Sequence, residues 1–153
     1  MIRVLCSTLL LMLIAGAASA GEVTIHDAWV REPPPGANAA AYLTIRNASD
    51  AAVRIVSVSS PAAERVELHK SSIEGGVARM TPVASLEVPA GGSVEFAPGG
   101  LHVMLIHPAR LEAGHTVPLR FALEGGGALE VEATVRKARG GHAGKAHGEG
   151  HPH

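Results

Sequence analysis

Hydrophobic and polar residues alternate along most of this chain in short stretches, a pattern that predicts β-strands. The stretches are rich in Val, Ile and Thr, and none keeps the apolar period of a helix over several turns. Between them lie PPPGAN, NASD, IEGG, PAGG, PGG and EGGG, which supply the turn residues that chain reversals need. The expected strands cover residues 23–31, 40–47, 52–59, 65–71, 77–83, 93–98, 101–107, 117–123 and 129–137.

Strands this short and this closely spaced favour an all-β domain. We expect an antiparallel Greek-key β-sandwich, related in architecture to immunoglobulin and cupredoxin domains. With 153 residues, 46% of them hydrophobic, the chain is long enough for one domain with a core and short for two. With 13 basic and 14 acidic residues, the chain has no excess of positive charge that would indicate binding to nucleic acid or to an anionic membrane.

Residues 1–20 have the pattern of a secretory signal peptide. Arg3 precedes an apolar run, and Ala18-Ser19-Ala20 suits cleavage after Ala20. The run is shorter than the ~20 residues of a spanning helix. Cys6 lies near the start of the run and does not end it, which argues against a lipid-modified cysteine. We therefore expect export without membrane insertion after cleavage, and a folded domain over residues 21–137.

Cleavage changes the chemistry available to the mature chain. It removes Cys6, the only cysteine, so neither a disulfide nor a thiolate remains. It also removes two of the four methionines and leaves Met80 and Met104.

Residues 138–153 differ in kind from the domain. They are rich in Gly and almost free of large apolar side chains, so we expect a disordered tail. Imidazoles on such a tail can bind Cu(II), Zn(II) or Ni(II) weakly, and a solvated tail without a role is the alternative. The tail histidines are His142, His147, His151 and His153.

Four residues of the domain form a candidate metal site. A hairpin centred within IEGG, between Glu74 and Gly75, places His69 directly opposite Met80 on one face. His102 and Met104 lie two apart on one strand and also share a face. Two same-face pairs brought together make a four-ligand site.

The donor types indicate which metal the site prefers. Two neutral imidazoles with two soft thioethers favour Cu(I). A blue-copper centre needs a thiolate, and catalytic zinc sites use His with carboxylate or thiolate, so both are disfavoured. Because protonated imidazole cannot ligate, acid should release the ion.

The spacing H-x10-M-x21-H-x-M resembles the signature of the periplasmic copper chaperone family PCu(A)C. It stands at His69, Met80, His102 and Met104 with no ligand missing or displaced. Supporting resemblance lies in AWVRE from Ala28, in PPPG from Pro33, and in AAYLTIRN over residues 40–47. Many family members have Met after the first histidine, where this chain has Lys70.

This resemblance implies a periplasmic, cupredoxin-like β-sandwich that binds one Cu(I) and hands it to an acceptor. We also expect a monomer, and a protein that is not an enzyme. The acceptor it implies is the dinuclear copper site of cytochrome c oxidase subunit II, or another copper chaperone. In some relatives His- and Met-rich extensions bind Cu(II), and the tail here has the histidines without methionine.

Two other functions compete with this interpretation. A periplasmic copper-buffering or resistance protein would share the site but lack a dedicated oxidase acceptor. An enzyme would have to use His26, His107 or His115, and no HExxH, nucleophile-elbow or paired-carboxylate motif accompanies them. His107 lies five residues from His102 and so faces the other side of a regular strand, which excludes it from the site. For His107 and His115 we expect structural roles.

Overall fold

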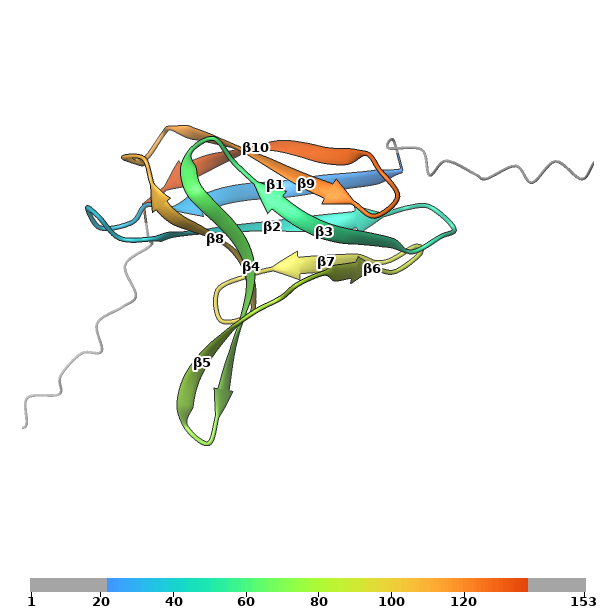
Figure 1. Cartoon of the computed structure of the whole chain (residues 1–153), viewed down its shortest axis with the longest axis horizontal. Helices are drawn as coiled ribbons and strands as arrows, with labels where there is room; N and C mark the ends of the chain where they lie inside the picture. Colours follow the sequence, from blue (N-terminus) through green and yellow to red (C-terminus); the bar gives the residue numbers. More distant parts are fainter. Residues whose placement is uncertain (1–21, 138–153) are drawn as a thin grey trace, which may run out of the picture.

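The computed structural model describes residues 22–137, which form a curved sheet of ten strands and contain no helix (Figure 1). In that part of the chain no helix is long and apolar enough to cross a membrane. The strands are β1 (Val23–Arg31), β2 (Ala39–Asn47), β3 (Val53–Ser59), β4 (Ala63–Glu74), β5 (Val77–Pro82), β6 (Leu86–Val88), β7 (Ser93–Phe96), β8 (Leu101–Pro108), β9 (Thr116–Leu123) and β10 (Ala128–Arg136).

The all-β architecture expected from the sequence is confirmed, with two departures. Neighbouring strands follow the order β5-β4-β8-β2-β1-β10-β9-β3-β6, and β7 pairs with β2. The first departure is from the expected antiparallel sheet. Every pair is antiparallel except β1 with β10, which is parallel and joins strands from the two ends of the described chain. The other departure is β6, a three-residue strand that the sequence pattern missed because so short a stretch shows no alternation.

The core lies on one face of each central strand. In β9, Val117, Leu119 and Phe121 are buried at every second position, as the period of a strand requires. Phe121 meets Phe96 of β7 edge to face, with ring centroids 6.4 Å apart. The largest fully buried side chains come from β1, β2, β3, β6, β8, β9 and β10: Phe121, Ile45, Ile55, Leu105, Leu119, Val30, Val88, Val103, Val117, Val135 and Asn47.

A bulge in β1 sets which side chains leave the core. The pairing of β1 with β2 shifts between His26 and Trp29, and Asp27 within the shift has a φ of 53°. Beyond the bulge Val30 is buried in the core, so Trp29 faces outward and contacts Tyr42 directly opposite, with ring centroids 4.8 Å apart. An aromatic pair therefore lies on the outer face of β1 and β2.

The β4–β5 hairpin projects from the rest of the sheet (Figure 1). Its loop is Gly75-Gly76, with φ of 58° and 79°, the positive values that a two-residue type I′ turn needs at both central positions. On the other side of β4, pairing with β8 ends at Lys70. The Ser71 N–H still donates to the carbonyl oxygen of Gly100 at 3.0 Å, just before β8, and residues 72–74 of β4 pair with β5 alone.

Candidate metal site

His69 of β4 and His102 of β8 lie directly opposite each other in the sheet. Their ring centroids are 5.8 Å apart, with the rings inclined at 63°. The residues next to them on each strand, Leu68 and Val103, are buried in the core, so both imidazoles stand on the outer face. The antiparallel register thus brings together two histidines that are 33 positions apart in the chain.

One nitrogen of His102 is held by the backbone and the other is left free. The ring is nearly buried, with 4% of the residue exposed. Nδ1 lies 3.1 Å from the carbonyl oxygen of Gly100. Because a carbonyl only accepts, Nδ1 carries the proton and donates it, and Nε2 presents a lone pair. That Nε2 is buried and has no hydrogen-bond partner among the described residues.

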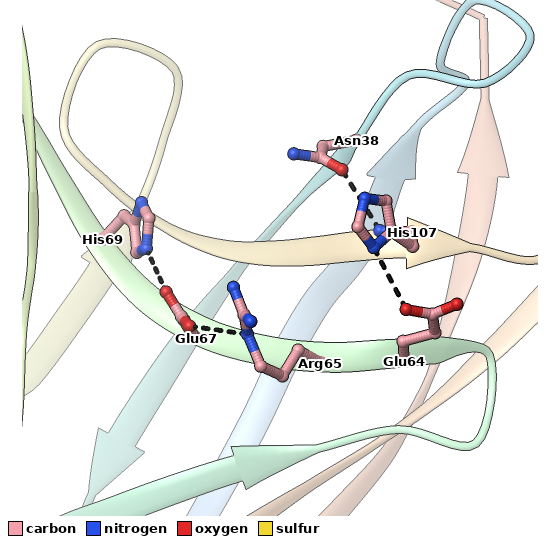
Figure 2. A network of polar contacts seen from close by, with 6 residues as sticks. All are labelled: Asn38, Glu64, Arg65, Glu67, His69 and His107. Atoms are coloured by element: carbon pink, nitrogen blue, oxygen red, sulfur yellow. Dashed lines mark hydrogen bonds and ion pairs between the residues drawn. The ribbon is translucent and has the colours of Figure 1, made fainter.

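His69 has the same arrangement with its two nitrogens exchanged. Its Nε2 lies 2.8 Å from Oε2 of Glu67 and donates to that carboxylate, as Figure 2 shows. The lone pair is therefore on Nδ1, which is buried without a hydrogen-bond partner within residues 22–137. Each histidine thus has its tautomer fixed by an acceptor and keeps one buried lone pair unused, which is the outer-shell arrangement of metal-ligating histidines.

Glu67 is in turn held by Arg65 (Figure 2). The guanidinium Nε of Arg65 donates to Oε1 of Glu67 at 3.0 Å, while Oε2 accepts from His69. The hydrogen bond from His69 is the largest cause that lowers the pKa of Glu67, and the charge of Arg65 lowers it further. Glu67 therefore stays an anion and a pure acceptor for His69.

The two methionines lie on the same outer face as the histidines. Met104 is two residues beyond His102 on β8 and directly opposite Glu67. Met80 is opposite Ser71, and the residue opposite His69 is Pro82. The predicted direct pairing of His69 with Met80 is therefore wrong, because the turn is centred on Gly75-Gly76 and not between Glu74 and Gly75. The observed register differs from the predicted one by two residues. Met80 therefore still lies on the same face as His69, but as its diagonal neighbour instead of its direct partner.

The remaining histidines of the described chain lie apart from this pair. His107, with a φ of 47°, pairs its Nδ1 with Glu64 at 3.1 Å in an exposed position at the far end of β8 (Figure 2). His115 accepts a bond from the backbone of Glu112, and His26 contacts Thr24. The tail histidines His142, His147, His151 and His153, and the signal peptide at residues 1–20, lie outside the described residues.

Glu67 is the member of this site that the sequence analysis missed. A signal for it was present, since Glu67 and His69 are two apart on one strand and must share a face. Together the site offers two buried imidazole lone pairs on facing strands with a thioether on each side. This donor set suits a soft metal ion.

Comparison with known proteins first places the domain in a structural class. The copper-bound PCuAC domain from PmoF2 superposes with a TM-score of 0.65, covering 79% of this chain and 97% of that one at 24% identity. The solution structure of CuI-DR1885 from Deinococcus radiodurans superposes with a TM-score of 0.62 at 35% identity, covering 80% and 83% of the two chains. The PCuAC-type fold expected from the sequence is therefore confirmed.

The family follows from the sequence comparison. The chain belongs to the family described as "Putative lipoprotein LpqE-like", whose model matches residues 23–135. It is 30% identical over 123 residues to "Putative lipoprotein Lxx21020" of Leifsonia xyli subsp. xyli. The aligned residues cover 79% of this chain and 74% of that protein.

Proposed function

We propose that this protein is a copper chaperone that binds one Cu(I) through His69, Met80, His102 and Met104 and delivers it to an acceptor. The observation that carries the proposal is the pair of unused nitrogens, Nδ1 of His69 and Nε2 of His102. A buried polar atom without a partner costs free energy unless something binds it. Two such lone pairs on facing strands, flanked by thioethers, find their partner in a single soft cation.

The copper-bound and Cu(I)-bound forms of similar domains support copper as the ion. Cu(I) is the oxidation state that two imidazoles and two uncharged thioethers favour. A secondary role for His142, His147, His151 and His153 in collecting Cu(II) is part of the same proposal, and rests on their imidazole content.

Export is the second part of the proposal. Residues 1–20 form a signal peptide cleaved after Ala20, residues 21–137 the copper-binding domain and residues 138–153 a tail, with the mature monomer in the periplasm. The word lipoprotein in the names of the family and the relative is compatible with export. In this chain Cys6 lies near the start of the apolar run and would be removed with it, so we propose that cleavage leaves no lipid-modified cysteine.

Delivery proceeds by ligand exchange. An acceptor with thiolate ligands approaches the outer face, and its sulfurs replace the neutral ligands of this site one at a time. No bond in an organic substrate is made or broken, so the protein is not an enzyme. The acceptor we propose is the dinuclear copper site of cytochrome c oxidase subunit II, directly or through a second copper chaperone.

The test is a Cu(I) titration of the mature chain against a chromogenic Cu(I) chelator, with the four tail histidines replaced by alanine. We expect one Cu(I) per chain. Loss of an outer-shell partner alone costs about 10–100-fold in metal affinity, so Met104→Ala, which removes a ligand, should cost at least roughly tenfold. Ile106→Ala is the matched control, because Ile106 is the next residue on the same face of β8. Unchanged one-to-one affinity in Met104→Ala would contradict the assignment.

A further inference from the structure

The exposed hydrophobic side chains of this domain are concentrated on the β4–β5 hairpin. Four large hydrophobic residues are exposed within residues 22–137, and three of them belong to this hairpin: Ile73 at 79%, Val77 at 58% and Met80 at 51%. The fourth, Val56, lies on β3. The part of the hairpin beyond Lys70 has no further strand on either edge. On one side β5 is the last strand of the sheet, and on the other the pairing of β4 with β8 ends at Lys70.

The two faces of the hairpin differ in chemistry. Cross-strand pairing puts Ile73 opposite Ala78 and Ser71 opposite Met80, so these four residues share one face, here called the apolar hairpin face. The other face carries Val77 among charged and polar residues that include Lys70 and an ion pair of 3.2 Å between Arg79 and Glu74. The apolar hairpin face begins beside His69 and leads outward to the turn.

We infer that the apolar hairpin face docks the protein that accepts the metal, an inference that rests on the proposed function. Met80 belongs both to this face and to the proposed ligand set. A sulfur atom of the acceptor must come within bonding distance of the ion before it can displace Met80. The acceptor therefore has to cover the surface around Met80, and the adjoining apolar surface is Ile73 and Ala78.

The small size of the apolar hairpin face favours a short-lived complex with the acceptor over a stable dimer of this chain. The four residues of this face span three positions on each of two strands, which measures about 10 Å by 10 Å, or roughly 100 Å². A stable protein pair buries about 800 Å² on each partner. A contact this small holds the partners only briefly, as copper delivery requires, and the acceptor should present an apolar patch next to its thiolates.

The test compares two variants of the full-length mature chain with the same new charge at two exposed hairpin positions. Ile73→Glu places the charge on the apolar hairpin face, and Val77→Glu places it on the opposite face. Cu(I) transfer is measured by stopped flow to the soluble copper domain of cytochrome c oxidase subunit II, and separately to glutathione at equal thiol concentration. We expect wild type to deliver faster to the protein than to glutathione. Ile73→Glu should slow only the delivery to the protein, by about tenfold, and Val77→Glu should leave both rates unchanged.

Three results would overturn the inference. The first is equal slowing by the two variants, and the second is delivery by wild type to the protein no faster than to glutathione. The third is a wild-type dimer that Ile73→Glu converts to a monomer in light scattering, which would make a second copy the occupant. Failure of the proposed function is separate, because it would appear as absent Cu(I) binding in the wild-type titration.

Discussion

Removing the carboxylate of Glu67 tests whether the histidines are held as metal ligands. In Glu67→Ala the Nε2–H of His69 loses its acceptor at 2.8 Å, so the ring is free to rotate and to exchange its proton between the two nitrogens. Outer-shell partners of this kind contribute about 10–100-fold to metal affinity. The Glu67 side chain is 35% exposed, so water replaces part of the lost bond, and we expect the lower end, about a tenfold weaker Cu(I) affinity. Glu67→Gln, whose amide oxygen still accepts, should lose less.

A matched control lies on the same strand. Glu64 binds Nδ1 of His107 at 3.1 Å, also a carboxylate–imidazole contact, but at the far end of β8 from His102 (Figure 2). Glu64→Ala should leave Cu(I) affinity unchanged. The assay is competition with a chromogenic Cu(I) chelator at pH 7, combined with ¹⁵N chemical shifts of the His69 ring, which report the tautomer. The reasoning is refuted if Glu67→Ala binds within twofold of wild type, or if Glu64→Ala loses as much.

Three further predictions follow from the geometry. Cu(I) affinity should fall between pH 7 and about pH 4.5, because protonated imidazole cannot ligate, and a flat profile in a chelator competition would argue against a two-histidine site. Trp29, the only tryptophan, faces outward beside Tyr42 and lies two strands, or roughly 10 Å, from His102. Its fluorescence emission should therefore change during a Cu(I) titration until one equivalent is bound. Constant emission at saturation would contradict this placement. Asn47→Ala should lower the free energy of unfolding by about 2–4 kcal/mol in urea melts, since the fully buried amide donates to the carbonyls of Ala51 and Val88 and accepts from Ser49. A loss below about 0.5 kcal/mol would show that water replaces those bonds.

The strands could be predicted from the sequence because alternation is a local signal. Val117, Leu119 and Phe121 alternate with polar or half-buried residues, and all three are buried as that pattern requires. The parallel pairing of β1 with β10 could not be predicted, because it joins residues about a hundred positions apart and depends on how the whole sheet closes. For the same reason no spacing rule places His69 opposite His102.

The candidate site shows the same division between local and long-range information. That His102 and Met104 share a face follows from the period of one strand, and the burial of Val103 and Leu105 agrees with it. The partner of Met80 depends on which two residues form the turn, and a shift by one turn position moved it from His69 to Ser71. The prediction that Met80 and His69 share a face is still correct, because a register shift of two residues leaves every side chain on the same face of the sheet.

Strand β8 separates two tasks by the pleat of its backbone. Val103 and Leu105 hold the sandwich together from one side, while His102 and Met104 stand on the other. Of the two outward positions, His102 is itself buried, whereas Met104 is half-buried, so a substitution at Met104 disturbs the packing of Val103 and Leu105 least. One donor of the proposed site can therefore be changed at Met104, for example to an imidazole in place of the thioether, without a compensating change in the core. At this position the ion preference of the proposed site can vary independently of the folding stability.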